Sequence, residues 1–347
     1  MMKKKRVIVF AILGAAVVLA AILCLFVGSS GMTVSECLAA LFGKGTPAAV
    51  RIVRNIRLPR MLAALIAGAG LSVSGLIMQT TLGNSMASPS TLGVSNAAVF
   101  GANLAIIASA GGFLSVGNHL DSYAVGANLF ATSGIAFLFS VVSILTILGL
   151  CRIRSFAPGV VVLAGIAIGS VWTAATTVLQ FYATDVGLSA AVIWSFGDLG
   201  RADFRADLMM LSVIAAAIVF FCFMRWRYNA LLSGEGTAIS LGVHVSVLRF
   251  VSLFMASLVT AVCVSFLGAI GFVGIICPHI AKKLLGQDHR VSLPASALTG
   301  SLLLLCADVL SRSIGSGSAL PVGAITSLIG APFFLAIIFG SGRGRHA

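Results

Sequence analysis

Charged side chains are scarce in this chain: they make up 9% of its 347 residues, and only nine of them are Asp or Glu. A soluble domain has roughly a quarter of its residues charged, so the composition excludes a soluble globular protein. Hydrophobic residues make up 59%, and the mean hydropathy is +1.11. Apolar runs of about 20 residues, enough to cross a bilayer, recur from end to end. The sequence therefore predicts an all-α polytopic membrane protein in which residues 1–347 form one domain.

Motifs that carry chemistry are also missing. The chain holds no G-x-x-x-x-G-K-[ST] loop for ATP, no G-x-S-x-G nucleophile elbow and no H-E-x-x-H helix. Its seven cysteines form no C-x-x-C pair, and its five histidines are scattered. We therefore expect no catalytic residues, no metal site and no cofactor in this chain.

The net charge is +13, which in a soluble protein would suggest a nucleic-acid partner. In a membrane protein, an excess of Lys and Arg more often marks the cytoplasmic loops beside the lipid headgroups. We therefore expect membrane lipid and no nucleic acid among the partners.

Apolar runs, divided at their polar and helix-breaking residues, predict ten membrane spans. They cover residues 7–28, 58–80, 92–112, 126–150, 158–182, 207–224, 249–267, 270–285, 293–312 and 321–339. The first could be a signal peptide, but its apolar part exceeds the 7–15 residues of a typical signal core. The basic cluster at residues 3–6 places the N-terminus in the cytoplasm. Ten spans return the C-terminus to the same side.

Most of the 22 Lys and Arg residues fall on the cytoplasmic side of this topology, in agreement with the positive-inside rule. The exception is the external segment "RIVRNIRLPR" (51–60), with an arginine at every third position. Pro59 predicts that no helix runs through the whole segment and that the second span begins near Arg57-Leu-Pro-Arg60. These arginines could anchor a helix end at the headgroups or meet an external partner. At the outer end of the ninth span, Asp308 and Arg312 are four residues apart, a spacing that allows a local ion pair.

Two further segments stand out. Residues 225–249 form the longest cytoplasmic loop, in which Gly234-Glu235 before an apolar-periodic stretch predicts a short surface helix. Pro278 and Pro321 would break or start helices at membrane depth, and such breaks usually line a cavity. These features alone indicate a transporter or a channel.

The fifth span carries four polar side chains. Thr176 and Gln180 share one helix face, and Thr173 and Thr177 share another. One of these faces could line a translocation path, or the side chains could make hydrogen bonds between helices. The sequence leaves both alternatives open.

Seven segments together resemble the FecCD family, the permeases of ABC importers for iron–siderophore complexes, haem and vitamin B12. They follow the family's order over nearly the whole chain and read "IRLPRMLAALIAGAGLSVSGLIMQ" (56–79), "NSMASPSTLGVSNAAVFGA" (84–102), "LAGIAIG" (163–169), "LSGEGTAISLGV" (232–243), "GAIGFVGIICPHIAKKLLGQDHR" (268–290), "LPASALTGSLLLLCADVLSR" (293–312) and "LPVGAITSLIGAPFFLAII" (320–338).

The resemblance implies a ten-helix type II importer fold in a bacterial or archaeal cytoplasmic membrane. A second permease subunit, identical or related, would pair with this one, with the path between them lined by residues 158–182 and 321–339. Two cytoplasmic ATPase subunits would bind the ATP, and an extracytoplasmic substrate-binding protein would dock outside. An iron chelate, either siderophore or haem, is the expected substrate, with cobalamin as the alternative. A passive channel or a membrane receptor would lack the exposed cytoplasmic helix.

The resemblance also implies roles for single residues. Docking of the binding protein is assigned to Arg57, Arg60 and Arg312, whose charges are expected to be exposed in the free permease. The inner gate is expected at Asn84, Ser85, Met86 and the turn 155–159, and the path at Thr173, Thr176, Thr177 and Gln180. The coupling segment comprises Gly234, Glu235, Thr237, Ala238, Leu241 and Gly242.

The chain departs from the family pattern at two places. The usual N-P-L-A-x-P reads Asn84-Ser-Met-Ala-Ser-Pro89, so Ser85 replaces one proline and Ser88 the customary acidic residue. The coupling segment has Ile239 where an arginine is usual.

Overall fold

A computed structural model describes residues 2–28, 31–109, 129–153, 156–314 and 319–340. Within these ranges the chain is almost entirely helical and forms no β-strand. The helices are α1 (Met2–Phe26), α2 (Val34–Leu41), α3 (Pro47–Arg51), the π-helix η1 (Ile52–Arg57), α4 (Leu58–Thr81), the 3-10 helix η2 (Pro89–Leu92), α5 (Val94–Ser109), α6 (Leu129–Ile153), α7 (Pro158–Phe181), α8 (Asp185–Ser195), the 3-10 helix η3 (Leu199–Arg201), α9 (Phe204–Leu232), α10 (Glu235–Ser240), α11 (Val245–Leu267), α12 (Val273–Leu285), α13 (His289–Ile314) and α14 (Val322–Gly340).

The ten predicted spans correspond to ten of these helices, so the all-α polytopic fold is confirmed. Within the described ranges, seven helical stretches are long and apolar enough to cross a membrane, and α5 and α14 are shorter apolar helices. The predicted parts 110–112 and 126–128 lie outside the described residues. The external segment between α7 and α9 adds α8, which the apolar runs did not predict.

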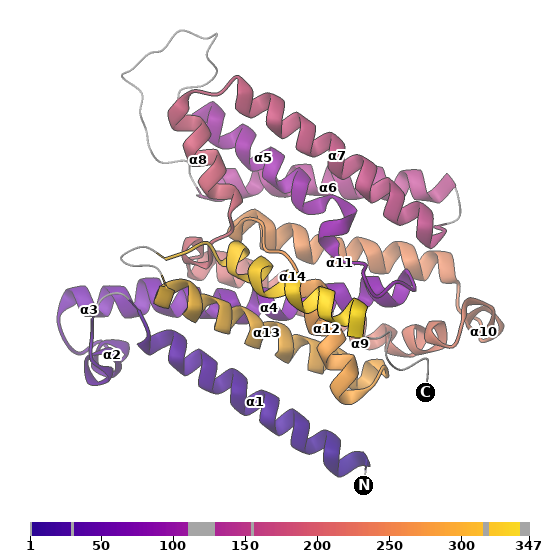
Figure 1. Ribbon diagram of the computed structural model, residues 1–347, viewed down its shortest axis with the longest axis horizontal. Helices are drawn as coiled ribbons and strands as arrows, with labels where there is room; N and C mark the ends of the chain where they lie inside the picture. The colour runs from indigo at the N-terminus through magenta and orange to yellow at the C-terminus, as the bar shows by residue number, and fades with distance from the viewer. Residues whose placement is uncertain (1, 29–30, 110–128, 154–155, 315–318, 341–347) are drawn as a thin grey trace.

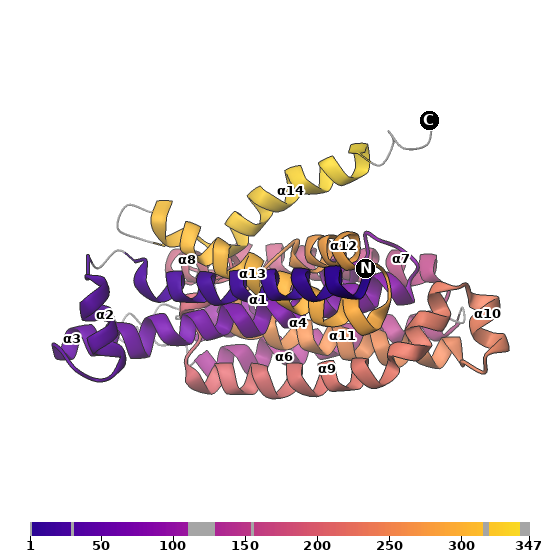
Figure 2. The same ribbon diagram turned by 90° about the horizontal axis from the view of Figure 1, so that it is seen from below.

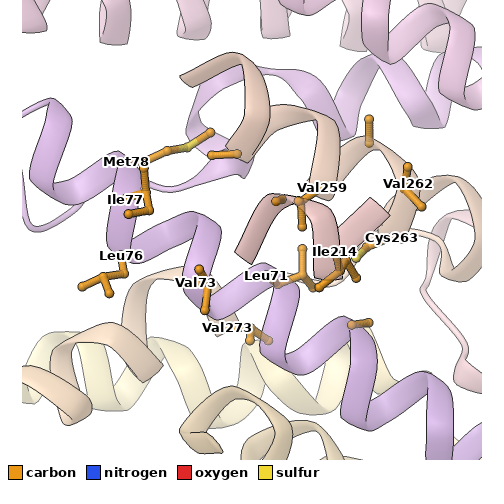
Figure 3. Close-up of a cluster of buried hydrophobic side chains, with 14 of the residues drawn as sticks. Leu71, Val73, Leu76, Ile77, Met78, Ile214, Val259, Val262, Cys263 and Val273 are labelled. Atoms are coloured by element: carbon orange, nitrogen blue, oxygen red, sulfur yellow. The ribbon is translucent and has the colours of Figure 1, made fainter. Parts of the chain in front are cut away.

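Helix α4 lies at the centre of the bundle. It packs against α9, α11, α12 and α13, and α1 covers the outside of α13 (Figure 1). In the close-up of the core, Ile214 of α9, Val259 of α11 and Val273 of α12 lie around Leu71 of α4 (Figure 3). These contacts bury most of the α4 side chains.

Glycine contacts bring α4 close to two partners. A Cβ built on Gly68 would overlap the carbonyl oxygen of Gly300 in α13, and one built on Gly75 would overlap the backbone of Gly274 in α12. Such approach of backbones through small residues is typical of helices packed in a bilayer. These positions explain part of the chain's glycine content.

The two ends of the bundle carry different short helices. In Figure 1, α2 and α3 lie at one end, and α10 lies at the opposite end together with the start of α1. The predicted topology assigns the first end to the outside and the second to the cytoplasm.

Helices α7 and α14 leave broad apolar surfaces open. Leu163, Val171 and Phe181 of α7 are exposed, as are Leu328 and Phe339 of α14. Figure 2 shows α14 projecting away from the layer formed by the other helices. Apolar faces of this size in a membrane protein contact either lipid or another subunit.

The prediction that Pro59 interrupts the helix is wrong. One helical stretch runs from Pro47 to Thr81, and η1 lies directly before the proline. In η1 the N–H of Leu58 donates to the carbonyl oxygen of Val53, five residues back. A π-turn of this kind relaxes the i→i−4 register, so the proline's missing N–H and bulky ring do not end the helix.

The predicted loop 225–249 is much shorter than expected, because α9 continues to Leu232 and α11 begins at Val245. Polar residues mark where a helix leaves the apolar layer, but they do not end it. The helix ends at Gly234, whose φ of +109° only glycine adopts readily. The predicted short surface helix is present as α10.

Candidate translocation path and coupling site

A groove of about 610 Å³ lies between η2, α5 and α7. Its lining comprises Asn84, Met86, Ala87, Ser90, Thr91, Gly93, Asn96, Val162, Gly165, Ile166, Gly169, Ser170, Thr173 and Ala174. Small, neutral side chains therefore form its wall, and the lining residues include no ionised side chain. Part of the predicted gate and part of the predicted path meet in this groove.

The two polar faces of α7 have different surroundings. Thr173 and Thr177 are exposed, and Thr173 lines the groove, where its hydroxyl accepts a hydrogen bond from Asn96 (2.9 Å). Thr176 is buried and donates to the carbonyl oxygen of Trp172, and Gln180 donates to Asn103 of α5 (2.8 Å). Both faces make hydrogen bonds within and between helices, but of the two only the Thr173 face meets the groove.

The turn after α4 separates two hollows. Asn84 and Met86 line the groove, whereas Ser85 lines a second pocket of about 550 Å³ on the other side. The side chain of Asn84 accepts from the backbone N–H of Met86 (2.9 Å), which closes a tight turn. A turn placed between two cavities is suited to a gate.

The Thr91 side chain stabilises the start of η2 by binding the backbone of Ser88, one of the residues that depart from the family pattern. The N–H of Ser88 donates to the Thr91 hydroxyl (3.2 Å), and that hydroxyl donates to the Ser88 carbonyl oxygen (2.6 Å). The other predicted gate segment, 155–159, is only partly described. Residue 155 lies outside the described ranges, and Phe156 is buried against Phe250 of α11.

The second pocket carries positive charge. Its lining includes His279, Lys282 and Lys283 of α12, and the Lys282 ammonium donates to the Gln79 side-chain oxygen (2.9 Å). The Gln79 amide in turn donates to the Gly274 carbonyl oxygen (3.3 Å). The cytoplasmic end of α4 is therefore fixed to α12.

Helix α10 is held to the bundle by one buried arginine. Both oxygens of Glu235 accept from the Arg249 guanidinium of α11, at 3.2 and 2.8 Å. The Nε of the same guanidinium donates to the carbonyl oxygen of Thr81, the last residue of α4 (3.0 Å). Ala238 is buried, whereas Ile239 and Leu241 are exposed. The segment Gly234–Gly242 thus presents apolar side chains outward from an anchored base.

A second polar cluster joins α9 to α13. Asn229 donates to Asp288 (2.7 Å) and accepts from the backbone N–H of His289 (2.9 Å), whose ring contacts the Thr80 hydroxyl of α4 (3.0 Å). Burial would raise the pKa of Asp288, but hydrogen bonds from Arg290 and Asn229 and the charges of Arg290 and Arg6 hold it below its ordinary value. Asp288 therefore stays ionised as an acceptor.

The external arginines are less accessible than expected. Arg57 and Arg60 are only 5% and 7% exposed, so the expectation that these charges are exposed in the free chain is wrong. Arg57 donates to the carbonyl oxygens of Leu25 and Phe26 at the end of α1 (2.7 and 3.1 Å). Uncapped carbonyl groups at a helix end accept readily from arginine, and this contact draws Arg57 inward.

Asp308 binds two of the three arginines proposed for docking. It is fully buried and accepts from Arg60 (2.5 Å) and Arg312 (2.6 Å). Arg60 also contacts Asp198 (3.2 Å), and Arg312 donates to Val27 (2.7 Å). Asp308 thus pairs with Arg312, as the sequence predicted, and also with Arg60, which lies 248 residues away in the sequence.

Several of these residues escaped the sequence analysis. Arg249, Asn96 and Asn103 each make contacts whose partners lie far away in the sequence. Their only sequence signal is that they are polar residues at or within apolar spans, where an unpaired polar group is costly.

The chain matches the FecCD transport family over residues 16–340. It is 43% identical over 336 residues to an ABC transporter permease protein of Methanocaldococcus jannaschii. That alignment covers 96% of this chain and 95% of the relative. It is 35% identical over 298 residues to the vitamin B12 import system permease protein BtuC of Escherichia coli, covering 86% of each. An inward-facing structure of a metal-chelate type ABC transporter matches it with a TM-score of 0.80 at 27% identity, over 96% of this chain and 99% of that one.

The family match, the relatives and the all-helical membrane fold of the described residues agree over nearly the whole chain. The protein belongs to the FecCD transport family and is a permease subunit of an ABC importer in the cytoplasmic membrane.

Proposed function

We propose that this permease moves an iron chelate, a ferric siderophore or haem, into the cytoplasm. In this proposal two separate ATPase subunits supply the energy, a second permease subunit completes the path, and an extracytoplasmic protein delivers the substrate.

The chemistry of the groove is the observation that supports a metal chelate as the substrate. Free metal ions are bound by carboxylate, imidazole or thiolate groups, whereas the groove is lined by amide, hydroxyl and small apolar groups. Among the described residues, no three His, Cys, Asp or Glu side chains are placed to hold a metal ion. A lining of this kind supports passage of a bulky molecule whose metal is already enclosed by an organic ligand.

Cobalamin is also an enclosed metal, and the 35% identity to the vitamin B12 permease supports it as the alternative. The two are distinguished by uptake into proteoliposomes that contain the permease, its ATPase and its binding protein. We expect ATP-dependent uptake of a ferric siderophore or haem that excess cyanocobalamin does not inhibit. Uptake of cyanocobalamin alone would overturn the iron-chelate assignment.

The site residues receive matching roles. The turn Asn84–Met86 acts as the inner gate, and the Thr173 and Thr177 face of α7 lines the path. The segment Gly234–Gly242, which contains α10, contacts the ATPase subunit. Thr176 and Gln180, expected on the path from the sequence alone, have the role of holding α7 against α5, supported by the hydrogen bond from Gln180 to Asn103.

Docking of the binding protein is proposed at the external rim where Arg57, Arg60 and Arg312 lie. Arginine forks suit acidic partners, and one nitrogen of Arg60, Nη2, has no hydrogen-bond partner among the described residues. An incoming carboxylate would have to join or displace Asp308. We therefore expect docking to be altered by Asp308→Asn, measured as binding-protein affinity for the reconstituted importer.

A further inference from the structure

We propose that Arg249 is a positioning residue that links the ATPase-facing helix α10 directly to the inner gate. The inference deepens the proposed function and rests on it only for the identity of the partner that moves α10. Its basis is the contact geometry at the cytoplasmic end of α4.

The link begins with a bidentate ion pair. Glu235 is the first residue of α10 and its side chain is half exposed, whereas the Arg249 side chain is only 7% exposed. Both carboxylate oxygens are engaged, and paired charge-assisted hydrogen bonds fix orientation as well as distance. A shift of the start of α10 therefore pulls on the guanidinium, because two charge-assisted hydrogen bonds join it to Glu235.

The same guanidinium reaches the gate. Its Nε donates to the carbonyl oxygen of Thr81, and the gate turn starts at the next residue. The turn amides are hydrogen-bonded back to α4: Gly83 donates to Thr80 (3.3 Å) and Asn84 donates to Gln79 (3.1 Å). The Arg249 guanidinium thus contacts α10 on one side and the base of the gate turn on the other.

From the turn, close backbone contact continues to the path helix. A Cβ on Gly165 of α7 would lie 2.8 Å from Leu92 and Thr91 of η2, and one on Gly93 would lie 2.7 Å from Gly169. With no side chain between them, η2 and α7 have little freedom to slide apart. The route from α10 to the groove therefore consists of one ion pair, one hydrogen bond, a short turn and a glycine contact.

Hydrogen exchange of the full chain in lipid nanodiscs tests the link without any substrate or ATPase. Glu235→Gln removes the charge but leaves Arg249 in place, so we expect the amides of residues 82–87 to exchange several-fold to about tenfold faster, as for the loss of one charge-assisted hydrogen bond. Arg249→Met should accelerate the same amides at least as much. Adding Glu235→Gln to Arg249→Met should then change nothing further in the turn, because the two residues act in series.

Arg152→Gln, at an exposed arginine on the cytoplasmic end of α6, is the control and should leave these amides unchanged. If Arg249 merely holds α10, Glu235→Gln loosens α10 and leaves residues 82–87 protected, and that result overturns the proposal. Should Arg249→Met fail to fold, the conservative Glu235→Gln still decides. Wild-type protein that imports no chelate with its ATPase would refute the proposed function, while the exchange result would stand separately.

Discussion

Asp308 holds two arginines in a buried site at the external end of the bundle. Asp308→Asn keeps the side-chain shape but removes the charge, leaving the guanidinium groups of Arg60 and Arg312, 8% and 10% exposed, without their shared counter-ion. Breaking a buried pair from one side costs about 3–5 kcal/mol. The partly exposed Asp198, 3.2 Å from Arg60, compensates in part. We therefore expect the free energy of unfolding to fall by about 3 kcal/mol.

Thermal unfolding in detergent, followed by size-exclusion chromatography, measures this loss. With an unfolding entropy of about 2.1 cal/mol/K per residue over the 347 residues, a change of that size should lower the Tm by roughly 4 °C. Asp185→Asn, on a residue without a charged partner among the described residues, should stay within about 1 °C, as is usual for substitutions away from buried networks. Replacing the whole cluster, Arg60→Met with Asp308→Leu and Arg312→Met, should recover most of the loss, because no uncompensated charge remains. An unchanged Tm for Asp308→Asn would refute the reasoning.

Two further predictions concern packing and the path. Gly75→Ala should sharply reduce the yield of folded protein, since its Cβ would overlap the backbone of Gly274, whereas Gly134→Ala, which faces open space, should be tolerated; equal yields would contradict the helix contact. In a cysteine-free background, Thr173→Cys should react quickly with a water-soluble thiol reagent and Thr176→Cys slowly, because only Thr173 lines the groove. Equal labelling of both would remove the distinction between the two faces of α7.

The spans could be predicted from the sequence because the thickness of the bilayer sets the length of apolar run that a spanning helix needs. The family segments also located α10. Helix boundaries were less predictable: the π-turn at η1 carries the helix through Pro59, and Gly234, not the first arginine, ends α9. Hydropathy predicts where a helix leaves the membrane, but it predicts neither the π-turn at η1 nor the end of α9.

The buried ion pairs could not be predicted, because their partners are brought together only by the tertiary fold. Arg60 and Asp308 come from α4 and α13, and Arg249 meets Thr81 across 168 residues. The sequence suggested that the arginines of residues 51–60 face outward. Arg51 and Arg54 do so, whereas carbonyl groups at the end of α1 draw Arg57 inward and the acid in α13 draws Arg60 inward.

The central claim is that this permease couples chelate import to a separate ATPase through α10. The most direct measurement is uptake of radioactive ferric siderophore or haem by proteoliposomes with ATP inside, comparing wild type with Glu235→Arg in the presence and absence of the ATPase subunit. We predict uptake only for wild type with the ATPase, because an arginine at 235 would repel Arg249 and displace α10. Uptake without the ATPase, or equal uptake by Glu235→Arg, would contradict the claim.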